Sequence, residues 1–147
     1  MHGLLLFLHV VAATIWTGGH LVLAIVVLPR VLKERSPAQL LRFESGYEKI
    51  GMPALVVQVV TGLMLAWRLL PDFAQWFDLS NPISRLVSLK LLFLALTLGF
   101  AIDARLRVIP RLAEENLVAM AWHIIPVTVF SVVFVFLGVS FRAGWLH

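Results

Sequence analysis

The chain is dominated by four apolar runs, each long enough to cross a lipid bilayer as a helix. They cover residues 3–28, 47–70, 83–104 and 117–141. A membrane-spanning helix needs about 20 apolar residues to cross the hydrocarbon core. The four runs and their connections account for nearly all of the 147 residues. The sequence therefore predicts an all-α integral membrane protein in which residues 1–147 form a single transmembrane domain.

The composition excludes most other classes of protein. Hydrophobic residues make up 61% of the chain and charged residues 14%, whereas soluble domains average about 45–50% and about 25%. A chain with no cysteine is not a disulfide-stabilised secreted scaffold. The net charge of +4 comes from Lys and Arg near the ends of the runs, which form no basic groove. We therefore expect the lipid bilayer as a partner and no nucleic acid.

The connections between the runs differ sharply in positive charge. The first and third connections contain Arg30, Lys33, Arg35, Arg42, Arg105, Arg107 and Arg111. The second connection, residues 71–82, contains no Lys or Arg. Because basic connections stay in the cytoplasm, we expect an up-down four-helix bundle in a bacterial-type cytoplasmic (inner) membrane, with both termini periplasmic.

Ionisable side chains inside a span are costly and usually functional. The candidates are His9, His20, Lys90 and His123, whereas His2 and His147 are terminal and expected to be solvated.

Two of these histidines lie on one face of the first span. His9 and His20 are eleven residues apart, which is three helical turns plus about 20° and about 16 Å along the axis. They therefore cannot bind one metal ion together, since metal–nitrogen bonds are only about 2 Å long. Trp16 falls on the same stripe, and a stripe of this composition is expected to face the bundle interior.

The alternating directions of the spans place the candidates at two depths. His20 and His123 lie about 9–12 Å inside the inner boundary, whereas His9 and Lys90 share an outer level. Two imidazoles from antiparallel helices at one depth suit a b-type haem bound on both axial sides. Trp16 would line the haem pocket. The simpler alternative to haem binding is that His20 and His123 form hydrogen bonds between the helices.

Four segments resemble one known family. They are LHVVAATIWTGGHLVLAIVVLP in the first run, MPALVVQVVTGLMLA in the second, SRLVSLKLLFLALTL in the third and GVSFRAG at the end of the fourth. Together they resemble the CopD copper-resistance domain family, with HxxxxxxWxGGH as the informative part. The pattern is related to the HemJ-type membrane oxidases, which bind haem b and have residues similar to His9, Trp16 and Lys90.

The resemblance implies copper handling at the cytoplasmic membrane. Cu(I) prefers Cys and Met ligands, and the chain has no Cys and four Met. The residue types therefore support copper binding only weakly, although the family resemblance implies it. The leading hypothesis is therefore a protein that binds b-type haem through His20 and His123. It would carry out electron transfer or redox chemistry with a quinone or another redox partner, and His9 and Lys90 would form an outer polar site.

Two other hypotheses stay open. The first is copper binding or transport, with His9 and His20 as successive sites. The second is a non-catalytic membrane subunit with hydrogen-bonded histidines. The sequence leaves open whether the chain is an enzyme, and assembly as a homo-oligomer is compatible with it.

The charge pattern makes a prediction about topology. A periplasm-active reporter fused after His147 should be active, because the seven basic residues of two connections are expected to hold those connections in the cytoplasm. A fusion that is active only in the cytoplasm would overturn the depth pairing of the candidates.

Overall fold

The computed structural model describes residues 2–145, and these residues form helices joined by short turns, with no strand. Four of the helical segments are long and apolar enough to cross a membrane. The predicted all-α four-helix membrane bundle is thereby confirmed. His147 lies outside the described residues.

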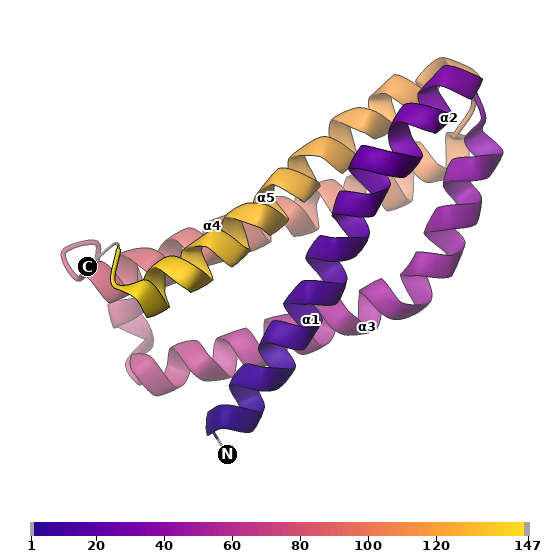
Figure 1. Ribbon diagram of the computed structural model, residues 1–147. Coiled ribbons are helices and arrows are strands. Elements are labelled where there is room, and N and C mark those ends of the chain that lie inside the picture. The colour runs from indigo at the N-terminus through magenta and orange to yellow at the C-terminus, as the bar shows by residue number, and fades with distance from the viewer. Residues whose placement is uncertain (1, 146–147) are drawn as a thin grey trace.

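The helices follow one another in a simple order (Figure 1). The first segment comprises α1 (His2–Val22), a π-helical turn (Leu23–Val27) and α2 (Leu28–Glu34). The second is α3 (Pro37–Leu69), and a 3-10 turn (Phe73–Phe77) follows it. The third comprises α4 (Pro82–Asp103), a π-helical turn (Ala104–Val108) and a 3-10 turn (Ile109–Arg111). A last 3-10 turn (Glu114–Asn116) leads into α5 (Leu117–Ala143).

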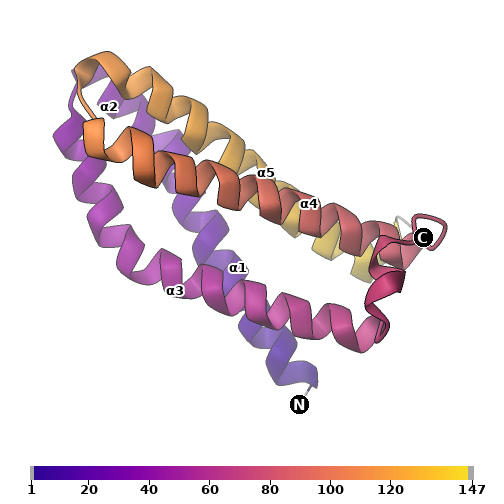
Figure 2. The same cartoon turned by 180° about the vertical axis from the view of Figure 1, so that it is seen from behind.

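The four segments pack mainly as two pairs. α3 packs against α1, α4 packs against α5, and α1 also contacts α5, whereas α3 and α4 scarcely touch each other. Both ends of the chain lie opposite the end that carries α2 (Figures 1 and 2). We call the end with α2 the inner end of the bundle, following the expected orientation.

α3 begins ten residues before the apolar run that predicts it. Pro37 stands in its first turn, where the missing N–H has no intrahelical partner to lose and the fixed φ suits a helix. The polar residues that follow continue into the apolar run as one helix. Figure 2 shows that α3 changes direction along its length, and Pro53 inside it explains the bend, since proline removes one helical hydrogen bond.

Each π-helical turn stands just before a proline. Pro29 follows Leu23–Val27, and Pro110 follows Ala104–Val108. A proline ring clashes with the carbonyl four residues earlier, and that residue lies within the π turn in both cases. The wider turn relieves the clash without ending the helix, and both turns lie at the inner end beside the candidate site.

The packed core is densest at the inner end. Leu23, Val31, Leu40, Leu117 and Met120 belong to one buried cluster there. Smaller clusters lie in the middle, around Trp16, Leu55 and Val127, and at the outer end, around Leu70, Trp76 and Val87. Many large apolar side chains elsewhere on the helices are exposed, as expected for surfaces that face lipid.

Candidate functional site

A pocket of about 100 Å³ lies between the four helical segments near the inner end. Its wall includes Trp16 and His20 from α1, Tyr47 and Met52 from α3, Phe100 and Ala101 from α4, and Met120 and His123 from α5. The structure thus brings His20 and His123 to one pocket, with Trp16 beside them.

His20 is buried and held from one side. Its Nδ1 lies 2.9 Å from the backbone oxygen of Trp16. A carbonyl only accepts hydrogen bonds, so Nδ1 carries the proton and donates it. In the neutral ring Nε2 then keeps its lone pair. Among the described residues none hydrogen-bonds to Nε2, and the Trp16 ring packs on the imidazole with centroids 4.3 Å apart.

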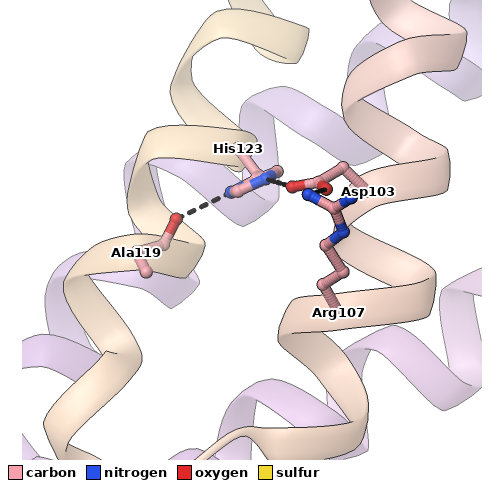
Figure 3. Close-up of polar contacts among 4 residues, drawn as sticks. All are labelled: Asp103, Arg107, Ala119 and His123. Atoms are coloured by element: carbon pink, nitrogen blue, oxygen red, sulfur yellow. Dashed lines mark hydrogen bonds and ion pairs between the residues drawn. The ribbon is translucent and has the colours of Figure 1, made fainter.

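His123 is held from both sides. Its Nδ1 lies 2.8 Å from the carbonyl oxygen of Ala119, and its Nε2 lies 2.8 Å from Oδ2 of Asp103 (Figure 3). Arg107 forms an ion pair with the other oxygen of Asp103, at 3.2 Å. Both ring nitrogens therefore face an acceptor within the bundle. Unlike His20, His123 has no ring nitrogen without a partner.

These contacts give no support to the expected haem clamp. A haem bound on both axial sides needs a free lone pair on each histidine, and both ring nitrogens of His123 already contact acceptors within the bundle. Pockets for cofactors and drug-sized ligands are about 300–1,000 Å³, several times the roughly 100 Å³ between these helices. Hydrogen bonding between helices, the simpler alternative, describes His123 and Asp103 directly.

Charged pairs lie at the rim of the pocket. Arg105, in the π-helical turn after α4, forms an ion pair with Glu48 of α3, and Asp103 and His123 link α4 to α5. The Arg105 pair thus bridges the third segment and α3, on the side of the pocket where α3 and α4 scarcely touch.

His9 lies at a separate level. Its Nδ1 is 3.0 Å from Oγ1 of Thr61, and that hydroxyl donates to the carbonyl of Val57 at 2.6 Å. The hydroxyl proton is therefore used, so His9 is the donor in the first bond. Gly62 leaves room for the ring, because a Cβ there would lie 3.0 Å from its Cε1.

Lys90 lies within electrostatic range of His9. No residue in the described part of the chain forms an ion pair or a hydrogen bond with its ammonium group. Within residues 2–145 no three His, Cys, Asp or Glu side chains gather closely enough to hold a metal ion by themselves. Any metal site here must therefore recruit another ligand type, such as a thioether.

The sequence did not single out two residues of this site for function. Asp103 stands near the end of the third apolar run, and only the rotation of α4 about its axis points it at His123. Tyr47 stands at the start of the second apolar run, and its hydroxyl donates to the Trp16 carbonyl at 3.0 Å. The sequence feature that could have pointed to Tyr47 is the pair of helical glycines Gly19 and Gly51, because side chains at these positions would overlap its ring.

Comparison with known proteins gives one match. The family model described as Copper resistance protein D (CopD) matches residues 41–141, which is more than half of the chain. The match includes α4 and most of α3 and α5, while α1, with His9, Trp16 and His20, precedes it. No curated protein and no solved structure matches the chain.

The shared carboxylate predicts a stability difference. Replacing Asp103 by Ala should lower the free energy of unfolding by about 1.5–3 kcal/mol, because a hydrogen bond to a charged partner is lost. Arg107→Gln should cost less than about 1 kcal/mol, because that pair is exposed. Denaturant titration in detergent micelles measures both, and equal costs would contradict the central position of Asp103.

Replacing Lys90, in contrast, should not lower the free energy of unfolding. Lys90→Met keeps the length of the side chain and removes a charge that costs about 2.5 kcal/mol or more inside a membrane. We expect a protein at least as stable as the wild type, by the same titration. Lys33→Met on the exposed face of α2 is the matched control, and should leave stability unchanged. A loss of stability in Lys90→Met would reveal a partner for the ammonium group.

Proposed function

The chain belongs to the CopD family of copper resistance proteins, and from this premise we propose that it binds copper ions inside the membrane and passes them between two levels of the bundle. The inner level is the four-helix pocket with His20, and the outer level is at His9. The membrane is the bacterial cytoplasmic membrane, with both termini periplasmic. Copper is the substrate in this proposal and not a resident cofactor.

The observation that carries the proposal is the state of His20. Metal-binding histidines usually donate one ring N–H to a carbonyl or carboxylate, which fixes the tautomer and directs the other nitrogen at the metal. His20 donates from Nδ1 to the Trp16 carbonyl and leaves Nε2 without a described partner. This ring is prepared to bind a metal ion on the wall of the pocket.

The remaining donors of the pocket suit copper. Met120, which is buried, and Met52, which is half-exposed, line the same pocket as His20. Thioethers select Cu(I), and imidazole is a good copper ligand. The residues present therefore fit a copper ion held by His20 and Met120, with Met52 as the third candidate.

His9 supplies a second and weaker site. Its Nδ1 donates to Thr61, so Nε2 keeps a lone pair as it does in His20. Lys90 acts electrostatically on this ring, and a like charge nearby opposes a bound cation. Copper is therefore held less tightly at the outer level, which favours transfer past Trp16 to the inner pocket.

We propose no haem, quinone or other redox partner for this chain. Both ring nitrogens of His123 contact acceptors within the bundle, and the second axial ligand of the haem hypothesis is therefore engaged elsewhere. The copper hypothesis needs only His20 and the thioethers, and it leaves His123 in its pair with Asp103.

Copper affinity tests the function directly. The purified protein in detergent, titrated with Cu(I) against a chromophoric chelator, should bind copper at the inner pocket. His20→Ala should weaken binding by at least about 10–100-fold, the usual cost of disturbing even an indirect partner of a metal site. Met120→Leu should weaken Cu(I) binding more than Cu(II) binding.

The matched control is His2→Ala, which removes an exposed histidine from the same helix and should leave the affinity unchanged. A wild-type protein that binds no copper would refute the proposal. So would a His20→Ala protein with wild-type affinity.

A further inference from the structure

We propose that Tyr47 is the positioning residue of the copper site. Together with the Trp16 carbonyl, it keeps the proton of His20 on Nδ1 and thereby leaves Nε2 with its lone pair. This inference rests on the proposed function for its consequence, but its physical basis is a hydrogen-bond arrangement that exists without copper.

The hydroxyl of Tyr47 faces backbone carbonyls of α1. It donates at 3.0 Å to the oxygen of Trp16 and lies 3.3 Å from that of Ile15. Because its proton is used for these carbonyls, the hydroxyl presents lone pairs to its other neighbour. That neighbour is Nδ1 of His20, 3.5 Å away.

Two oxygens therefore surround Nδ1 of His20, and both act as acceptors toward it. One is the Trp16 carbonyl at 2.9 Å, and the other is the Tyr47 hydroxyl. A proton on Nδ1 is stabilised by both oxygens, whereas a lone pair on Nδ1 would face both of them. The arrangement selects the tautomer with Nδ1–H and directs the lone pair of Nε2 at the pocket.

Two glycines hold the Tyr47 ring in place. A Cβ on Gly19 of α1 would overlap the ring, and one on Gly51 of α3 would lie 2.8 Å from it. Phe43 stacks on the ring with centroids 5.8 Å apart, and His20 meets it edge-on. The ring is confined between two helices, so the hydroxyl is delivered to one place.

The confinement of the Tyr47 ring explains why residue 19 is a glycine. Glycine inside a helix costs about 1 kcal/mol relative to alanine, so a glycine beside His20 needs an explanation. The structure supplies it, because the ring of Tyr47 fills the space that a side chain at Gly19 would need.

The decisive variant is Tyr47→Phe, which keeps the ring between the glycines and removes only the hydroxyl. The first measurement uses copper-free protein and records the ¹⁵N resonances of the His20 ring. The wild type should show Nδ1–H alone, and the variant should show a measurable fraction of Nε2–H beside it, because only the Trp16 carbonyl still accepts from Nδ1. The second measurement is Cu(I) affinity by chelator competition, which should fall by about 10–100-fold.

Two further variants separate positioning from packing. Thr14→Ala removes a hydroxyl that donates to the Val10 carbonyl on an exposed part of α1, and should change neither the tautomer nor the affinity. Gly51→Ala displaces the ring from its place, and should reproduce both effects of Tyr47→Phe.

The outcomes distinguish this inference from the proposed function. A Tyr47→Phe protein with only Nδ1–H overturns the inference, even if its copper affinity falls, because Tyr47 would then act otherwise than through His20. Mixed tautomers in that variant, together with a wild type that binds no copper, support the hydrogen-bond arrangement and refute the copper function.

Discussion

The absence of water in the hydrocarbon core is the constraint on which the rest of this structure depends. A polar group that faces lipid there has no partner, so a buried hydroxyl is stabilised when it finds an acceptor within the bundle. Thr128 of α5 donates to the carbonyls of His20 and Ile124, and Thr17 of α1 donates to that of Ser131. These bonds between α1 and α5 join the two helix pairs at the depth of the pocket.

The same constraint explains how two histidines acquire different chemistry. His20 and His123 each donate from Nδ1 to the carbonyl four residues earlier in the helix. The difference lies in Nε2, which has no hydrogen-bond partner among the described residues in His20 and contacts the carboxylate of Asp103 in His123. One ring is thus available to a metal ion, while the other has become part of an ion pair between α4 and α5.

Much of the fold could be predicted because length and apolarity alone require four helices. The depth of a residue also follows from counting along a helix, and His20 and His123 do line one pocket. The partners of each ring could not be predicted, because they depend on the rotation of helices about their axes. Asp103 reaches His123 only by the rotation of α4, and Tyr47 reaches Trp16 only because two glycines admit its ring.

The π-helical turns carry a consequence for how such chains tolerate insertions and deletions. A single residue added to or removed from a helix rotates everything beyond it by about 100°. A deletion inside Leu23–Val27 can be absorbed when the wider π turn becomes ordinary α-helix. Val31 then keeps its place in the inner core with Leu40, both of them fully buried. A deletion between His9 and His20 would instead rotate these two rings relative to each other by about 100°. The π turns therefore tolerate a change in length that the α-helical part of the first segment does not.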